Sequence, residues 1–505
     1  MKLRYNALIL FFLAASLLSC EDFLTEDPPG QLVAETFYQN EEEAIAAVNG
    51  IYPNLGLGWD NYGRTMQILT MLPTDVMKDG LGMPNQHLQN LSYYAHSSVN
   101  QWSESIWQDH YSIIASANSA INNIPNVPEG NINEDLRTRL IGEARFLRAL
   151  AYFNLVRFYG GVPIITQIER LEDANEPRAP VNEVYNLILD DLEYAQNNLP
   201  ISYPVSEFGR ATEGAAKILE GKVHLTRQNW QESVDKLAEV VENEGQYGYG
   251  LHEDYQDNWA PGDERGIEAV FSIDYGKPPL PNNASMMSLQ GPKYSLIGSP
   301  EAFGIPANEA ELPTLELYNE YEEEDSRRYV TLRSEFMGAD GEMHGTSHPL
   351  FAKYWENGVT SLAEGSVNFH ILRYSDAILM YAEALNEIGN TSEAENQLNR
   401  ILERAFQSTD HNVNGLTQQQ FRDKVLHERK LELVDEAHRW FDLVRTGRLV
   451  ERMQEFGQVE SELSEGHHGN YADIITRVSE KHMLFPIPQS EIDKRPDLYE
   501  QNPGW

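Results

Sequence analysis

The side chains best suited to chemistry in this sequence are aromatic residues within long segments rich in glycine and proline. A flat Trp or Tyr ring packs well against the apolar C–H face of a pyranose. Asn, Gln and Asp offer fork-shaped groups that pair with sugar hydroxyls. The candidates for a sugar-binding surface are the aromatic residues Trp259, Tyr275, Tyr294, Tyr354 and Trp355, and the polar residues Asp79, Asn85 and Gln86. The alternative is that these rings pack beneath their own loops, and the sequence leaves both open.

Motifs for catalysis are weak by comparison. The chain has 78 Asp and Glu residues, so carboxylate pairs of the glycosidase kind arise by chance. It contains neither a G-x-S-x-G nor an H-E-x-x-H motif, and the segment 214–223 lacks the Ser or Thr of a phosphate-binding loop. The adjacent pair His467-His468 has no evident third ligand nearby. We therefore expect binding without catalysis, and neither a metal nor a cofactor.

The single cysteine, Cys20, stands directly after a leader-like segment. Basic residues open the chain, and the apolar run at 8–18 is about half of the ~20 residues that a membrane-spanning helix needs. The letters LLSC at 17–20 are typical of a lipoprotein cleavage site. The sequence predicts a signal peptide at 1–19 and an acylated Cys20, with fatty chains such as palmitate as the anchor. The alternative is an ordinary leader with an incidental cysteine.

The charge of the chain excludes one class of partner. The net charge is −40 over 505 residues. A nucleic-acid-binding protein needs a basic footprint, and no basic cluster is evident here. No apolar run after the leader approaches spanning length. We expect a large folded ectodomain that does not bind nucleic acid.

Helical periodicity dominates the mature chain and must position the candidate residues. One apolar stripe runs along a helix that ends at Gly160-Gly161; it consists of Leu140, Ala144, Leu147, Ala151, Leu155 and Phe158. Two later segments have the spacing of tetratricopeptide hairpins. Their small-residue pairs, Gly221 with Ser233 and Ala382 with Ala394, are each twelve residues apart and let two helices approach closely. The alternative is two unrelated helical hairpins.

Other residues on these helices are expected to be structural. Trp107 and Tyr111 lie four apart on one helical face, and Trp440 and Phe441 lie side by side; all four are assigned to the core. A second set, Arg145, Arg148 and Tyr152, shares the face opposite the apolar stripe. An unpaired buried arginine is costly, so we expect pairing with carboxylates such as Asp442.

Four stretches give the chain a family resemblance. They are "CEDFLTEDPPG" leading to "TFYQNEEEAIAAVNGIY", then "EARFLRALAYFNLVRFYGGVPI" from 143, "ERKLELVDEAHRWFDLVRTGR" from 428, and the tail "LFPIPQSEIDKRPDLYEQNPGW". In order and content they resemble the SusD/RagB outer-membrane lipoproteins of Bacteroidetes. The resemblance implies a mostly α fold: a tetratricopeptide-like scaffold of about four helix pairs, packed against a less regular, loop-rich part.

The resemblance also implies an organisation and a role. One globule would comprise an N-terminal part at 20–255 and a C-terminal part at 256–505, with a loop-rich insert at 256–368. The protein would be tethered through Cys20 to the outer membrane, and the acidic pair Glu21-Asp22 is similar to a surface-export signal. It would bind a glycan and pass it to a SusC-like, TonB-dependent β-barrel, without catalysis. The competing hypotheses are a tetratricopeptide-type protein that binds peptides for a peptide importer, and a lipid-anchored glycan hydrolase.

Overall fold

The computed structural model describes residues 37–56, 60–80, 85–167, 175–260, 266–275, 290–291, 309–337, 342–356, 365–464 and 471–505. The predicted signal peptide, Cys20, Tyr294 and the pair His467-His468 lie outside these residues. Helices dominate the described part. In its first half they are α2 (Glu41–Asn49), α3 (Thr65–Met71), α4 (Gln86–Ser92), α5 (Gln101–Asn123), α6 (Glu134–Tyr159), α7 (Val181–Asn198), α8 (Glu213–Thr226), α9 (Trp230–Val241) and α10 (Glu244–Tyr247).

The second half of the chain alternates short strands with further helices. Its helices are α12 (Leu315–Glu320), α13 (Arg327–Thr331), α14 (Tyr374–Glu387), α15 (Thr391–Phe406), α16 (Gln418–Leu433), α17 (Arg439–Arg445), α18 (Leu449–Leu463), α19 (Tyr471–Arg477) and α20 (Gln489–Lys494). Three antiparallel strand pairs complete the described structure. They are β1 (Met77–Asp79) with β3 (Glu311–Pro313), β2 (Ala269–Ile273) with β6 (Phe369–Arg373), and β4 (Leu332–Met337) with β5 (Met343–Phe351).

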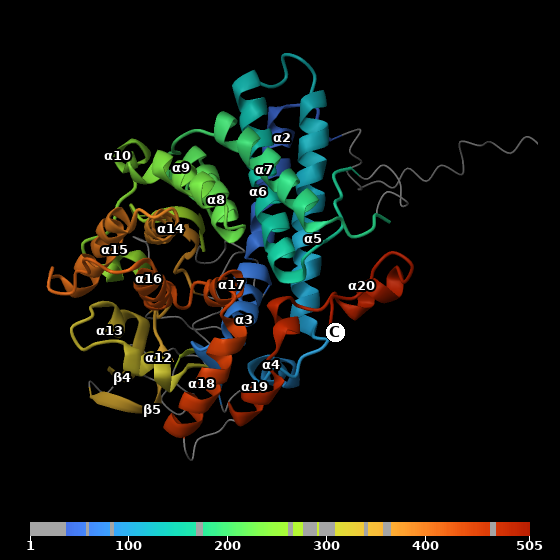
Figure 1. Ribbon diagram of the computed structural model, residues 1–505. Helices are drawn as coiled ribbons and strands as arrows, with labels where there is room; N and C mark the ends of the chain where they lie inside the picture. Colours follow the sequence, from blue (N-terminus) through green and yellow to red (C-terminus); the bar gives the residue numbers. More distant parts are fainter. Residues whose placement is uncertain are drawn as a thin grey trace, which may run out of the picture.

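The helices form one curved layer. Figure 1 shows it running from α5 through α6, α7, α8 and α9 to α14 and α15, each helix packed on the next. α16 packs on α14, and α17 and α18 follow it toward the C-terminus. This arrangement confirms the predicted mostly α, tetratricopeptide-like scaffold.

The long helix α6 shows how local signals set its limits. The side chain of Asn133 accepts hydrogen bonds from the backbone N–H groups of Asp135 and Leu136, which caps the start. Gly160 ends the helix with a φ of 72°, a left-handed conformation that glycine adopts without strain. The apolar stripe predicted over 140–158 lies inside this helix and is buried.

The two predicted hairpins are confirmed as α8–α9 and α14–α15. In the first, the Ser233 hydroxyl donates to the carbonyl of Gly221 at 3.0 Å. A Cβ atom placed on Gly221 would lie 2.5 Å from Cγ of Leu237, so only glycine permits this approach. In the second, Ala382 and Ala394 are both fully buried between the helices.

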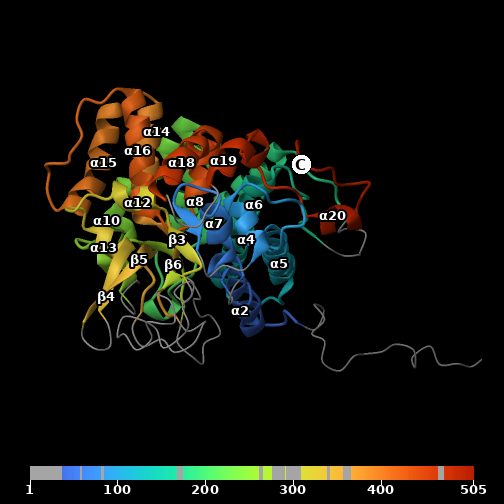
Figure 2. The same cartoon turned by 90° about the horizontal axis from the view of Figure 1, so that it is seen from below.

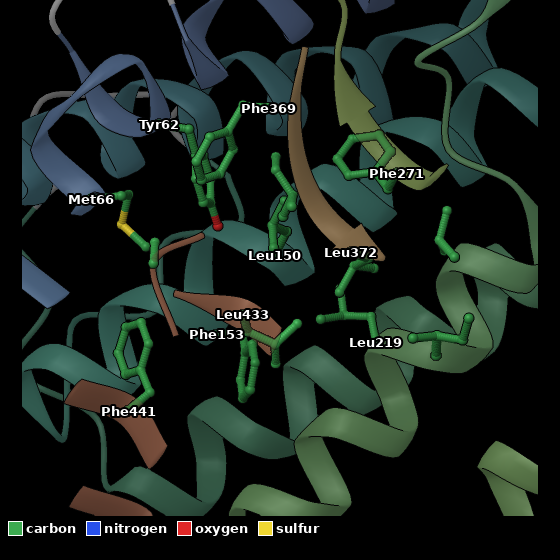
Figure 3. Close-up of a cluster of buried hydrophobic side chains, with 14 of the residues drawn as sticks. Tyr62, Met66, Leu150, Phe153, Leu219, Phe271, Phe369, Leu372, Leu433 and Phe441 are labelled. Atoms are coloured by element: carbon green, nitrogen blue, oxygen red, sulfur yellow. The ribbon is translucent and has the colours of Figure 1, made fainter. Parts of the chain in front are cut away.

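The core joins distant parts of the chain. Figure 3 shows Phe271 of β2 and Leu372 of β6 gathered with Leu150 of α6 and Leu219 of α8. The β2–β6 pair therefore lies against the helical layer. Within the predicted loop-rich insert at 256–368 the structure places β2, β3, β4, β5, α12 and α13, so this part is more regular than the sequence suggested. Figure 2 shows β3 to β6 grouped on one side of the molecule.

One predicted ion pair has a different partner. Arg148 does pair with a carboxylate, but its Nε and Nη2 donate to Asp191 of α7, each at 2.8 Å. Arg145 lies 3.6 Å from the same carboxylate. The expected partner Asp442 is wrong, because α7 covers this face of α6 whereas Asp442 belongs to α17.

Candidate ligand-binding site

Three of the aromatic candidates form one buried cluster. Trp259 ends a short 3₁₀ helix (Tyr255–Trp259), and its ring meets that of Tyr354 edge to face, with centroids 5.6 Å apart. The side chains of Trp259, Tyr275 and Tyr354 are only 4%, 2% and 1% exposed. A sugar needs an open ring face to stack on. In this arrangement these three rings contact protein, which matches the alternative that they pack beneath their own loops.

Buried charges hold this aromatic cluster in place. The Lys353 ammonium lies 4.8 Å from the centre of the Trp259 ring and donates to Glu436 at 2.8 Å. The hydroxyl of Tyr354 donates to the backbone carbonyl of Asp435 at 3.1 Å. Burial and the nearby carboxylates raise the pKa of Tyr354 well above its usual value. The cluster thus joins the insert to the segment after α16.

Trp355 differs from its neighbour Tyr354 because its side chain is only partly buried. The guanidinium of Arg333, on β4, lies 5.1 Å from the centre of its ring. A partly buried ring beside a cation has the chemistry of a sugar contact, because the cation is a hydrogen-bond donor. Trp355 therefore stays a candidate for sugar contact.

The polar candidates lie around β1 and α4, which pack together. Asp79 ends β1 and is partly buried, and this burial raises the pKa of its carboxyl. Asn85 caps α4 by accepting from the backbone N–H of His87 at 2.9 Å. Gln86 is exposed and donates to Asn90 at 2.9 Å. β3 pairs with β1 and also packs on β5, and Trp355 stands in the segment that follows β5.

A hollow that the sequence did not indicate lies between α5 and the C-terminal segment. Its volume is about 380 Å³. Aromatic rings and polar side chains line it together: Trp107, Tyr111 and Tyr499, with Gln108, Ser112, Asn118, Glu491 and Arg495. Trp107 is buried, as predicted, whereas Tyr111 is partly exposed. The i, i+4 pair on α5 was the only local signal, because the opposite wall comes from residues almost 400 positions later.

The chemistry of this hollow suits a polyhydroxylated ligand. The Trp107 and Tyr111 rings lie 5.2 Å apart, and the Arg495 guanidinium lies 5.6 Å from the Tyr499 ring. The Arg495 guanidinium also donates to Glu491 at 3.1 Å. A ring surface beside a carboxylate and a guanidinium offers both apolar packing and hydrogen bonds.

The described residues carry neither a metal cluster nor a membrane-spanning helix. Among these residues no group of three or more His, Cys, Asp and Glu side chains is placed to hold a metal ion. No described helix is long and apolar enough to cross a bilayer.

Comparison with known proteins defines the class of this protein. The family model "SusD family" matches residues 344–505, and the model "Starch-binding associating with outer membrane" matches residues 22–225. The chain belongs to the SusD/RagB family, a family of glycan-binding proteins associated with the outer membrane.

Individual relatives match along almost the full length. SusD-like protein P25 of Formosa agariphila is 29% identical over an alignment of 552 positions, gaps included, and this alignment covers 99% of each chain. The crystal structure of a SusD homologue from Bacteroides thetaiotaomicron has a TM-score of 0.79 and 25% identity, covering 94% of this chain and 98% of the other. A laminarin-binding SusD-like protein has a TM-score of 0.76 and 25% identity, covering 93% of this chain and 100% of the other.

Proposed function

We propose that this chain is a cell-surface lipoprotein that captures a poly- or oligosaccharide and delivers it to a SusC-like, TonB-dependent transporter. The observation that carries the proposal is the match to SusD-like proteins along nearly the whole chain, including one that binds laminarin. The acyl chains on Cys20 would hold it at the outer membrane, facing outward. Capture would rest on contact alone, without bond cleavage.

Two surfaces are the proposed points of contact. One comprises Trp355 with the polar residues around β1 and α4, and the other is the hollow beside Tyr111. Both combine a partly exposed ring with amide or charged side chains. The two surfaces lie in different parts of the protein, so a substitution in one of them tests that surface without changing the other.

A glycan array with the ectodomain that starts at Glu21 tests this function. We expect retention of one polysaccharide class, and a loss of about fivefold or more in affinity for Trp355→Ala or Tyr111→Ala, since one stacked ring contributes about 1 kcal/mol or more. Trp230→Ala is the matched control, because Trp230 is a partly buried tryptophan on α9. Release of reducing ends by the purified protein would contradict capture without catalysis.

A second candidate is a peptide-binding component of a peptide importer. The tetratricopeptide-like stack of α8–α9 and α14–α15 favours it, because such helix pairs present extended concave surfaces. Binding to a peptide array with no retained glycan would select this alternative.

The lipid anchor makes a separate prediction. Cys20→Ala should yield a folded protein that leaves the membrane pellet, because no acyl chain then holds it. The measurement is fractionation of cells that also lack the partner barrel, so that protein contacts do not retain the chain. A variant that stays in the pellet as firmly as the wild type would show that lipid is not the anchor.

A further inference from the structure

Arg157, near the C-terminal end of α6, is a half-buried cation whose hydrogen bonds go to neutral groups. Its Nε donates to the carbonyl of Phe153 at 3.2 Å, and its Nη2 donates to the side-chain oxygen of Asn154. The guanidinium carbon lies 4.0 Å from the Phe153 ring and 3.6 Å from the Phe441 ring, two residues that Figure 3 shows in the core. Burial lowers the pKa of Arg157 to about 10. No ion pair to Arg157 is formed within the described ranges.

The nearby carboxylates are already engaged by other cations. Three carboxylates here accept bonds from three cations in a closed set of ion pairs. The pairs are Asp376 with Lys222 at 2.9 Å and Arg429 at 2.8 Å, Asp442 with Arg429 at 2.9 Å and Arg445 at 2.8 Å, and Glu383 with Arg445. Arg157 is therefore one positive charge more than this group neutralises.

A cavity of about 190 Å³ opens beside these cations, and we call it the Arg157 cavity. Arg157, Lys222, Tyr185, Thr226, His438 and Arg445 are among its lining residues. Thr226 and Arg445 are partly exposed, which indicates an opening to solvent on their side. The volume accommodates a small ion together with a few water molecules, since one water takes about 30 Å³.

Cations outnumber carboxylates in the cavity wall, where Arg157, Lys222, Arg429 and Arg445 stand with the single carboxylate of Asp442. Nδ1 of His438 lies 3.2 Å from the Lys222 ammonium, which only donates, so Nδ1 is the acceptor. Burial and neighbouring cations lower the pKa of His438 to about 3, so the ring is neutral at pH 7 and carries its proton on Nε2. The cavity thus combines excess positive charge with N–H donors.

We propose that the Arg157 cavity binds a small oxyanion: a sulfate, a phosphate or a carboxylate. A half-buried cation that forms no direct ion pair is costly, and a bound anion would lower that cost. Nε and Nη2 of this guanidinium already donate to Phe153 and Asn154, whereas its Nη1 makes no hydrogen bond to a described residue and is the proposed donor to the anion. The anion is either free in solution or part of an acidic sugar, and in the second case the cavity serves the proposed glycan capture.

Titration of the full chain in detergent tests this site. The probes are sodium sulfate and sodium glucuronate, each against sodium fluoride at equal ionic strength. We expect saturable binding by calorimetry and a rise of about 1–3 °C in Tm at saturation. Sulfate binding indicates a free-ion site, and binding of glucuronate alone indicates a sugar-borne carboxylate.

Arg157→Gln should weaken binding by about tenfold or more, because it removes a charge-assisted donor, and Arg157→Lys should restore part of it. Arg137→Gln is the matched control on α6, since Arg137 bonds Glu134 and backbone carbonyls. An equal anion response in all variants would overturn the proposal. If Arg157→Gln fails to fold, selenate soaked into crystals of the wild type decides: an anomalous peak beside Arg157 supports the site, and an empty cavity at saturating selenate overturns it.

Discussion

Burial divides the tryptophans of the candidate set into two kinds. Trp259 is enclosed by Tyr354, His370 and the Lys353 ammonium, whereas Trp355 is only partly buried. The same residue type, in the same kind of segment, therefore has a structural role in one case and remains available for a ligand in the other. Of the two tryptophans, only Trp355 can stack on a sugar without unfolding the residues around it.

This difference predicts opposite effects of two substitutions. Trp259→Ala should lower the free energy of unfolding by about 3–5 kcal/mol, because it leaves a cavity in a packed core. Trp355→Ala should change it by less than about 1 kcal/mol and act on ligand binding instead. Urea unfolding followed by fluorescence measures both. Equal losses of stability in the two variants would contradict this division.

The stability lost when an ion pair is broken also depends on how deeply the pair is buried. Asp442 is 4% exposed and accepts hydrogen bonds from Arg429 and Arg445. Asp442→Asn should destabilise the protein by about 3–5 kcal/mol, because two buried cations then lose their counter-charge. Asp423 pairs with Arg448 at the surface, with 56% of its side chain exposed. Asp423→Asn is the control and should cost less than about 1 kcal/mol. The urea midpoints of the two variants make the comparison, and a neutral Asp442→Asn would contradict it.

At the scale of elements, close helix approach depends on small residues. The α8–α9 hairpin brings Leu237 so near Gly221 that a methyl group does not fit. Tetratricopeptide spacing in the sequence predicted the close approach of these two helices, because the small residues Gly221 and Ser233 are twelve residues apart. The hairpin could thus be found without knowledge of the rest of the fold.

Gly221→Ala should therefore destabilise the protein, by about 1–3 kcal/mol from overpacking, despite the better helix propensity of alanine. The control is Gly245→Ala in α10, where no atom lies within 4 Å of the added Cβ. That variant should be neutral or more stable by up to about 1 kcal/mol. In a Leu237→Ala background, which carries its own cavity cost, Gly221→Ala should cost less than in the wild type if the clash is the cause. Thermal unfolding of these variants measures this.

At the scale of the whole molecule, a buried ion network connects the strands to the helical layer. Arg373 of β6 donates to Glu268, to Glu432 of α16 and to Glu436, at 2.7–2.9 Å. These partners are distant in sequence and fully enclosed. The network fixes how the two parts of the chain sit on each other, since a displaced partner would leave a buried charge unpaired.

The network predicts acid sensitivity. Arg373 and Lys353 overcome the effect of burial and hold the pKa of Glu436 at about 2, below its usual 4.5. A lowered folded-state pKa stabilises the protein above about pH 4.5, and this contribution disappears as the pH falls toward 2. Glu436→Gln should cost about 3 kcal/mol at pH 7, and the difference from the wild type should shrink between pH 4.5 and 2. Urea midpoints against pH measure it, and a difference that stays constant would contradict the assignment.

The sequence alone determined the features that depend on neighbours along the chain. The apolar stripe of α6, its end at Gly160, and the two close hairpins follow from periodicity and from glycine or alanine at fixed spacing. The four long family stretches determined the fold class. The predicted leader and Cys20 belong to this group too, since their signal is entirely local.

Tertiary structure decided everything that depends on residues far apart. It buried Trp259 and Tyr354 while leaving Trp355 partly open, and it gave Arg148 the partner Asp191. The hollow beside Tyr111 and the charge surplus at Arg157 arise only where remote segments meet. The physical reason is that burial and charge balance are properties of a three-dimensional neighbourhood, whereas periodicity and capping are properties of a few consecutive residues.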